Sequence, residues 1–282
     1  MIFPNTRDIK SNIQTESDMI IDFHCHAFPQ KIAGAALSTL KEKINIEPYT
    51  DGTVSGTVRM MDKWGIDRAV ICNIATNPRQ QTNVNNFAIE TAASCDRLFP
   101  LGSIHPDSEA IEDELQRIKS HGLRGIKIHP DYMGHCINEK CFDVIFDVCS
   151  ALDLFVITHA GFDVCSPDLI HATPDMISEV IARHPRLKLV AAHFGSNEMY
   201  GEVEEKLCGK NLWIDTSLAY VENTDPSVLM RILNKHDGEK ILFASDCPWC
   251  PPDENVRFIE DFGLGDERND NIFFKNALKL LK

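Results

Sequence analysis

The stretch MIIDFHCH, residues 19–26, carries the strongest structural signal in the chain. Its first five residues are apolar except for Asp22, as expected of a parallel strand that is buried on both faces. On a strand, His24 and His26 point to the same side, so their imidazoles can bind one cation. Because a single His-x-His pair arises easily by chance, the interpretation depends on the strands that follow.

Seven further apolar runs come after this stretch, and most precede a segment with apolar residues at helical spacing. The eight predicted strands are 20–23, 69–74, 99–104, 125–129, 154–159, 188–193, 212–216 and 241–245. The predicted helices are 84–94, 111–120, 141–152, 175–183, 227–235 and 271–281. Alternating strands and helices imply right-handed crossovers and a parallel sheet. Eight such units without a linker favour fold class α/β, a (β/α)8 TIM barrel in a single domain.

Two segments fall outside this alternation. Residues 27–56 form a long loop after strand one, in which we expect an inserted helix at 31–43. In a barrel this loop lies on the active-site face, so we expect it to cap the site; a simple packing excursion is the alternative. Residues 1–18 are polar and are expected to form an N-terminal extension, which leaves 19–282 as the barrel domain.

Composition narrows the classes of partner. The 282-residue chain has a formal net charge of −14, which argues against nucleic acid or an anionic membrane surface as the main partner. No apolar run approaches the roughly 18–20 residues of a membrane span, and residues 1–18 lack the apolar segment of a signal peptide. The ten cysteines show no disulfide spacing. We therefore expect a cytoplasmic protein with reduced cysteines and a small-molecule substrate; a homo-oligomer is neither indicated nor excluded.

Groups that can bind metal occur at the ends of five predicted strands. The motifs are HCH at 24–26, GIKIHP at 125–130, THAG at 158–161, AHFG at 192–195 and ASDCPW at 244–249. A barrel brings the carboxyl ends of its strands to one mouth, where its enzymes keep their sites. Imidazole and carboxylate are the usual ligands of a catalytic zinc. We therefore expect His24, His26, His159 and Asp246 to bind one divalent metal per chain, most readily Zn²⁺.

Two further residues are expected to contact substrate. His129 lies two residues after Lys127 and faces the same way, toward metal or substrate. Trp249 lies inside the Cys247-x-x-Cys250 motif, which could belong to a redox or zinc site. The motif follows strand eight and precedes two prolines instead of opening a helix, so a wall of the pocket is the better interpretation for Trp249.

Taken together, these motifs resemble the amidohydrolase superfamily over residues 19–282. They are most similar to the amidohydrolase-related (amidohydrolase 2) branch of metal-dependent TIM-barrel hydrolases, related to aminocarboxymuconate semialdehyde decarboxylase. The resemblance implies that His24, His26 and His159 hold the metal. It implies that Asp246 is a ligand or near-ligand and takes a proton from the metal-bound water. It implies that His193 binds a second metal or polarises the substrate. Lys127 matches a lysine that some members carbamylate to bridge two metals, although in this branch it is commonly unmodified.

The functional expectation is hydrolysis of a small-molecule amide, lactone or ester by a metal-activated water. A non-oxidative decarboxylase of the same fold is the alternative, because both reactions use the same ligands. A non-catalytic metal-binding barrel is less favoured, since every expected ligand is present. A metal-dependent deoxyribonuclease is disfavoured by the acidic charge and the lack of a basic stripe.

Overall fold

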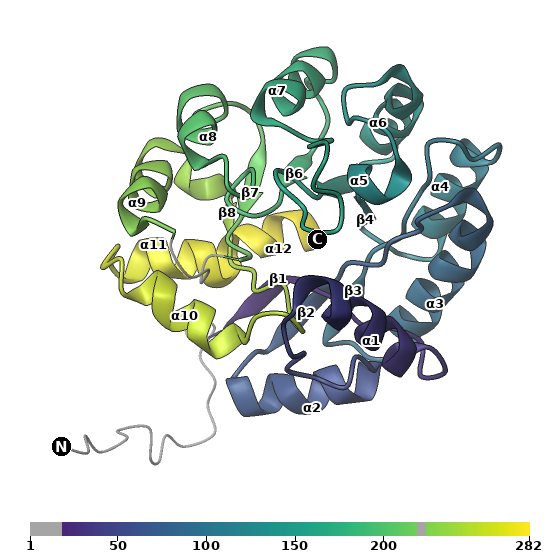
Figure 1. Ribbon diagram of the computed structural model, residues 1–282, viewed down its shortest axis with the longest axis horizontal. Coiled ribbons are helices and arrows are strands. Elements are labelled where there is room, and N and C mark those ends of the chain that lie inside the picture. The colour runs from purple at the N-terminus through teal and green to yellow at the C-terminus, as the bar shows by residue number, and fades with distance from the viewer. Residues whose placement is uncertain (1–18, 219–223) are drawn as a thin grey trace.

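The computed structural model describes residues 19–218 and 224–282, and the predicted extension 1–18 lies outside these ranges. Eight parallel strands alternate with helices, which confirms the barrel (Figure 1). The strands are β1 (Ile21–Cys25), β2 (Arg68–Ile71), β3 (Leu98–Pro100), β4 (Gly125–Ile128), β5 (Phe155–Thr158), β6 (Leu189–Ala191), β7 (Trp213–Asp215) and β8 (Ile241–Leu242). The main helices are α1 (Ala33–Ile44), α2 (Val54–Trp64), α3 (Gln81–Ser94), α4 (Ile111–Ser120), α6 (Asp143–Ala151), α7 (Pro174–Arg183), α8 (Tyr200–Lys206), α9 (Pro226–Lys235), α10 (Pro252–Glu260) and α12 (Asn276–Leu281).

Shorter turns connect these elements. They are α5 (Pro130–Met133), α11 (Asp266–Asp270), the 3₁₀ turns η2 (Pro78–Gln80), η3 (Lys140–Phe142) and η4 (Gly238–Lys240), and the π-helical turn η5 (Asn271–Lys275). In Figure 1 most helices form a ring around the strands; α12 is drawn inside that ring, and so are α1 and α5. Both α1 and α5 follow the carboxyl end of a strand, so they lie on the face where barrel enzymes keep their sites.

The strands pair in two groups, β1–β2–β3 and β4 to β8, and two seams close the barrel between the groups. At the β3–β4 seam the Gly102 N–H donates to the Gly125 carbonyl at 3.1 Å, and the Lys127 N–H donates to the Gly102 carbonyl at 2.8 Å. At the β8–β1 seam the Asp246 N–H donates to the His24 carbonyl at 2.9 Å. A Cβ on Gly102 would lie 2.6 Å from Ile118 Cδ1, so a larger residue at this seam would displace the Ile118 side chain.

Local sequence explains where the helices begin. The Thr53 side chain accepts a hydrogen bond from the Gly56 N–H and starts α2, and Thr173 does the same for α7 through the Met176 N–H. Asp225 caps α9, whose first residue is Pro226. At the end of α2, Gly65 adopts a left-handed φ of 70°, a common way for a helix to stop.

The boundaries differ from the sequence prediction in three ways. Strands β2 to β8 end earlier than predicted, because the chain leaves the ladder before most of the residues that carry chemistry, whereas β1 extends to Cys25 and includes His24. Helix α2 was not predicted, although its Thr53 cap and Gly65 stop are visible in the sequence. The predicted helix 271–281 is a π-helical turn followed by α12.

The predicted helix in the long first loop is present as α1. We call residues 27–53, between β1 and α2, the cap segment. It is tied to the barrel by hydrogen bonds from the Phe28 N–H to the Gly52 carbonyl at 2.7 Å and from the Tyr49 N–H to the Pro248 carbonyl at 2.8 Å. Leu37 of α1 is buried and packs on Gly52. These contacts attach α1 to the face on which β8 ends.

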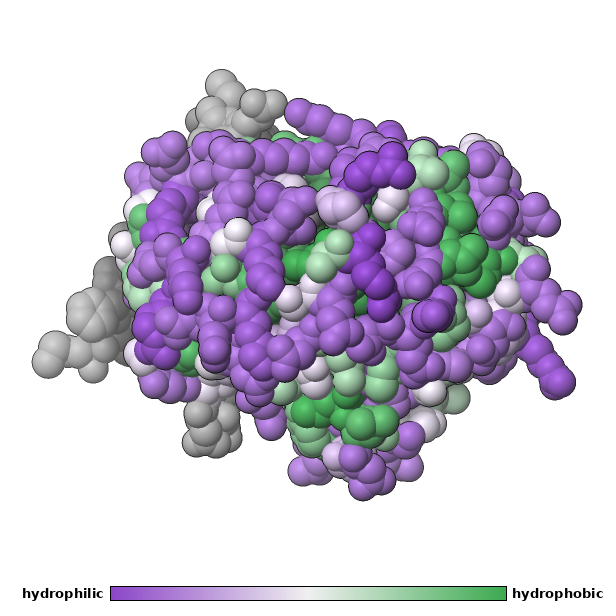
Figure 2. Space-filling view, turned by 90° about the horizontal axis from the view of Figure 1, so that it is seen from above, coloured by the Kyte–Doolittle hydropathy of each residue, from purple (hydrophilic) through white to green (hydrophobic). Residues whose placement is uncertain are grey.

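The surface and the cysteines fit the composition. Hydrophilic residues predominate on the face seen in Figure 2, with apolar residues in small separate groups. All ten cysteines are free thiols, and five of them are buried. Within the described ranges, no helix combines the length and apolarity needed to cross a bilayer.

Candidate metal centre

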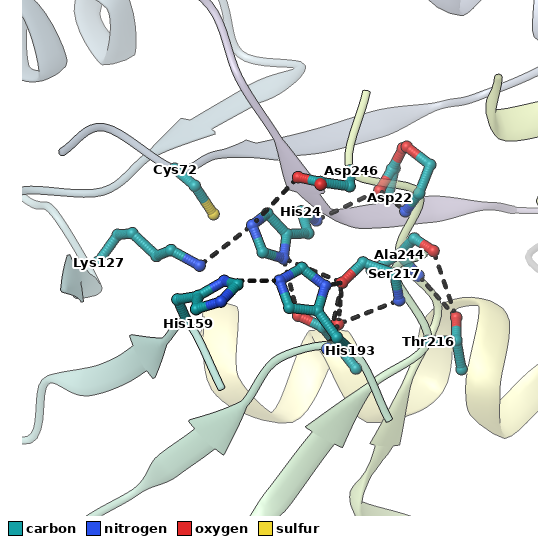
Figure 3. A network of polar contacts seen from close by, with 12 residues as sticks. Asp22, His24, Cys72, Lys127, His159, His193, Thr216, Ser217, Ala244 and Asp246 are labelled. Atoms are coloured by element: carbon teal, nitrogen blue, oxygen red, sulfur yellow. Dashed lines mark hydrogen bonds and ion pairs between the residues drawn. The ribbon is translucent and has the colours of Figure 1, made fainter. Parts of the chain in front are cut away.

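The carboxyl ends of the strands bring the predicted residues into one polar network, the mouth of the barrel (Figure 3). His24 lies within β1 and Lys127 within β4, whereas His26, His159, His193 and Asp246 follow their strands. His24, Lys127 and His193 are almost fully buried, at 1%, 1% and 2% exposure. Buried polar groups must find partners within the protein or in a ligand, so their contacts indicate what the site can hold.

One group of donors consists of His24, His26 and Asp246. The Asp246 Oδ1 atom lies 3.0 Å from His26 Nε2 and 3.5 Å from His24 Nε2. His26 Nδ1 donates to the Cys72 carbonyl at 2.9 Å, so a neutral His26 has only a lone pair at Nε2. Two acceptors at 3.0 Å require a proton or a cation between them. This contact therefore fits a metal held by these three residues.

A second pair lies beside the first group. His159 Nδ1 is 3.0 Å from His193 Nε2. Lys127 Nζ donates to His24 Nε2 at 3.1 Å. His159 is thus in contact with His193, and it is not in the close group formed by His24, His26 and Asp246 within the described residues. The donors form two half-sites, with the lysine beside the first of them.

The carboxylate of Asp215, at the end of β7, accepts hydrogen bonds from nitrogen atoms of His24 and His193. His24 Nδ1 donates to Asp215 Oδ2 at 3.0 Å, which leaves Nε2 with the lone pair that a metal needs. The other oxygen, Oδ1, accepts from the Ser217 hydroxyl and, at 3.0 Å, from the His193 N–H. The Ser217 oxygen accepts in turn from His193 Nδ1 at 2.8 Å. One carboxylate and one hydroxyl therefore orient histidines of both half-sites.

The electrostatics agree with this assignment. Burial and the charge of Lys127 lower the pKa of His24 to about 4, so its imidazole is neutral at physiological pH. Burial also lowers the pKa of His159 and His193. For Asp246, burial alone would raise the pKa, but the hydrogen bond from His26 and the nearby histidines lower it to about 2. Neutral imidazoles beside an ionised carboxylate are the donor set that a divalent cation requires.

His129 belongs to the wall next to His159. Its ring stacks on Tyr132 with centroids 3.7 Å apart, and on His159 with centroids 4.2 Å apart. His129 Nε2 lies 3.3 Å from Asp163 Oδ2, and His159 Nε2 lies 4.0 Å from the same atom. The His129 Nδ1 and His159 Nε2 atoms are buried and have no hydrogen-bond partner. The stack therefore leaves polar atoms that a ligand or a water could satisfy.

Backbone conformation marks the same positions. Outside glycine, a positive φ is uncommon, yet His193 has φ 60° and Asp246 has φ 70°. Gly161, after His159, has φ 88°, and a Cβ there would clash with the Asn197 backbone. Trp249 is half-buried. Its backbone N–H donates to the Asp246 carbonyl at 2.9 Å, which keeps Trp249 next to the predicted ligand. Its role as a pocket wall stays a prediction.

Asp215, Ser217 and Asp163 were not identified from the sequence. Asp215 interrupts an apolar strand run and ends it, which is the same signal that identified Asp246. Ser217 and Asp163 lie in loops, where polar residues are ordinary. Nothing in the sequence distinguishes them from other loop residues.

Comparisons with known proteins give the family. The family model described as Amidohydrolase matches residues 21–282. Solved structures with the same fold include an uncharacterised TIM-barrel protein from Bordetella bronchiseptica, with a TM-score of 0.75 and 17% identity over 93% of this chain and 98% of that one. No curated protein matches the chain.

Two similar structures are 5-carboxyvanillate decarboxylases. The one from Sphingomonas paucimobilis has a TM-score of 0.71 and 18% identity over 94% of this chain and 99% of that one. The one from Novosphingobium aromaticivorans is a complex with manganese and 4-hydroxy-3-methoxy-5-nitrobenzoic acid, with a TM-score of 0.69 and 16% identity over 94% of this chain and 96% of that one. At these identities the likeness establishes the fold alone.

Proposed function

From the premise that this chain is an enzyme of the amidohydrolase family, we propose that it is a metal-dependent, non-oxidative decarboxylase of a small aromatic carboxylate. The proposal reverses the order of the two reactions expected from the sequence. It is supported by the two decarboxylases of like fold, which align over nearly their whole length. Manganese in one of them also leaves the choice of metal open between zinc and manganese.

The observation that carries the proposal is the buried cation in the mouth. Lys127 is 1% exposed, and none of the ion pairs among the described residues involves it. A buried charge without a carboxylate in direct contact is costly, so this position favours a ligand that brings a negative charge. A substrate carboxylate meets that need. Lys127 would bind and orient it next to the metal ligands.

The donors fit a divalent metal, since neutral imidazole nitrogens and the Asp246 carboxylate converge. His24, His26 and Asp246 would hold the metal, with His159 and His193 beside them. When bound, the metal would supply a Lewis acid that draws electron density from a substrate oxygen.

Proton transfer completes the reaction. In decarboxylation the bond between the ring carbon and the carboxylate breaks, carbon dioxide leaves, and the carbon takes one proton. The pKa of Asp246 is lowered to about 2, so its carboxyl group is ionised and would be available to take a proton from a substrate hydroxyl or water and pass it to the carbon. The His129 ring is stacked between Tyr132 and His159, so it would contact an aromatic substrate through its edge.

Hydrolysis is the second candidate, and the contact between His159 and His193 favours it. If a second cation binds His159 Nδ1, the proton of this imidazole is on Nε2. The Nε2 atom can then donate toward Asp163, so it is no longer without a hydrogen-bond partner. In that arrangement Lys127 would be carbamylated. The state of Lys127, a free ammonium or a carbamate, therefore separates the two candidates.

The test is a product assay with metal-loaded enzyme on hydroxylated aromatic carboxylates, lactones and N-acyl amino acids. We expect release of carbon dioxide from an aromatic carboxylate, with the activity lost in His26→Ala and kept in His121→Asn, a change at an exposed histidine. Cleavage of a lactone or amide without carbon dioxide would instead establish the hydrolase. Carbon-13 NMR after incubation with labelled bicarbonate would then detect the carbamate on Lys127.

A further inference from the structure

A second cluster of metal-type ligands lies outside the mouth. We call Asp107, His135, Glu139 and Cys141 the rim cluster. Asp107 is in the loop after β3, and the other three lie between α5 and α6. Donor atoms of His135, Glu139 and Cys141 all lie within 4.8 Å of one another. The residues are partly exposed, with His135 at 24% and Glu139 at 47% for their side chains, so an ion can reach them from solvent.

The donors are already oriented by contacts on their outward sides. His135 Nε2 donates to both oxygens of Asp107, at 3.0 and 3.1 Å, which directs Nδ1 toward Glu139. Glu139 Oε1 accepts from the Cys136 N–H at 2.6 Å, which leaves Oε2 facing His135 Nδ1 at 3.1 Å. A carboxylate behind the imidazole is the usual support of a metal-binding histidine.

Without a metal, hydrogen bonds alone account for three of the four residues of the rim cluster. The side-chain hydrogen bonds of Glu139 and Asp107 raise the pKa of His135, so an imidazolium between two carboxylates satisfies all three groups. Cys141 is not explained by that arrangement. Burial, with the nearby charges of Glu139 and Asp107, raises the pKa of its thiol. A cation in the cluster would favour the thiolate and take the place of the proton on His135 Nδ1.

We propose that His135, Glu139 and Cys141 form a second, thiolate-containing metal site of the zinc class, with Asp107 orienting His135. Three protein ligands of imidazole, carboxylate and thiolate type, with one position left for water, are typical of zinc. The thiolate separates this site from the mouth, where none of the ligand groups within the described residues contains sulfur. A soft ligand disfavours manganese and magnesium, so the two sites should differ in metal preference.

The site would fasten two parts of the rim. Asp107 and His135 are 28 residues apart, and the contact between them joins the loop after β3 to the segment after α5. His105 supports this junction, because its Nδ1 accepts from the Asp107 N–H at 3.2 Å. The proposal does not depend on the reaction catalysed at the mouth.

The test uses cobalt(II) as a spectroscopic substitute for zinc in the full-length protein. We expect a sulfur-to-cobalt charge-transfer band whose final intensity corresponds to one thiolate-bound cobalt per chain, in addition to any cobalt bound at the mouth. It should persist in His24→Ala, where the mouth is damaged. It should disappear in Cys141→Ser and persist in Cys136→Ser, the matched control at the neighbouring thiol. Removing the orienting carboxylate in Asp107→Asn should weaken binding by about 10–100-fold.

Circular dichroism checks that each variant is folded. Glu139→Gln changes an exposed side chain, and it provides a second test if Cys141→Ser fails to fold. It should weaken cobalt binding at the thiolate site by at least roughly 10-fold. The proposal is overturned if saturating cobalt gives no charge-transfer band in the unmodified protein. It is also overturned if the band survives Cys141→Ser, or if Glu139→Gln binds cobalt as tightly as the unmodified protein.

Discussion

The mouth and the rim cluster use the same kinds of side chain in opposite surroundings. The mouth takes its donors from strands that are distant in sequence and buries them, whereas three of the four rim residues lie within the span 135–141. Burial lowers the pKa of His24 and His193 in the mouth, so these imidazoles present lone pairs. At the rim, hydrogen bonds to the Glu139 and Asp107 carboxylates raise the pKa of His135, so it holds a proton to higher pH than a free imidazole does.

This difference teaches that residue type alone does not decide whether a histidine is a ligand or a cation. Desolvation penalises the charged imidazole, and nearby carboxylates favour it. At the mouth desolvation outweighs the attraction of Asp215 for His24, and at the rim the carboxylates outweigh desolvation. The rim can bind metal only by displacing a proton, whereas the mouth can bind metal on neutral imidazoles. Four experiments can break or sharpen this comparison.

The largest effect is expected from Asp246→Asn. The change keeps the size of the side chain and removes the base, so turnover should fall by about 10²–10⁴-fold while the protein stays folded. Metal content at the mouth should be partly retained, since the histidines remain. Asp261→Asn, at an exposed carboxylate, is the control and should be neutral. Once a substrate is known, near-normal turnover in Asp246→Asn would show that another group moves the proton.

The second effect concerns the buried cation. Lys127→Met replaces a buried ammonium that has no carboxylate in direct contact with an apolar chain of similar length, so the metal-free protein should gain stability on the order of 1–3 kcal/mol. Substrate binding should be lost at the same time. Chemical denaturation measures the first effect and KM the second. A lower denaturation midpoint would mean that the hydrogen bond to His24 outweighs the cost of burying the charge.

Asp215→Asn tests whether the mouth depends on its supporting carboxylate. The amide can present an N–H to His24 Nδ1 and so disturb the tautomer that leaves Nε2 free. Metal affinity at the mouth should fall by about 10–100-fold, measured by competition with a chelator. Affinity at the rim should not change. Equal affinities in the variant and the unmodified protein would contradict the positioning role of Asp215.

The smallest effect is expected at the rim without metal. Because the folded-state pKa of His135 is raised, its ion pairs stabilise the protein below the ordinary value of 6.5, and this stability is lost as pH rises through the folded-state pKa. His135→Gln should therefore lower the free energy of unfolding by less than about 1 kcal/mol near pH 5.5 and by almost nothing near pH 9. Chemical denaturation at both pH values, in the presence of a chelator, measures this difference in the free energy of unfolding. A cost that is larger at pH 9 would mean that His135 acts as a neutral residue.

The sequence was sufficient for the barrel, because each strand is an apolar run and each run precedes a helix. It also placed the donors of the mouth, since His24, His159, His193 and Asp246 stand at the ends of those runs. It could not group the donors, because grouping depends on which strands are neighbours in the closed barrel. The link between His24 and Asp215 spans 191 residues and depends on how β7 lies relative to β1.

The rim cluster was missed for a different reason. In the sequence His135 lies between the predicted strands and helices, and its neighbours Glu139 and Cys141 show no strand-end pattern. The turn after α5 folds them together through local backbone hydrogen bonds such as the Glu139 N–H to the Cys136 carbonyl at 2.9 Å. Compact turns of this kind have weaker sequence signals than strands.

The two seams of the barrel have a consequence for amide hydrogen exchange. Strands β1 and β8 are joined by only a few hydrogen bonds, among them the Asp246 N–H to the His24 carbonyl and the His26 N–H to the Cys247 carbonyl. Local opening is easiest where few contacts must break, so these amides should exchange faster than those within β4 to β6. A metal that bridges His24 and Asp246 would oppose the local separation of β1 from β8. Slower exchange of the His26 amide would therefore report metal binding at the mouth in the absence of any substrate.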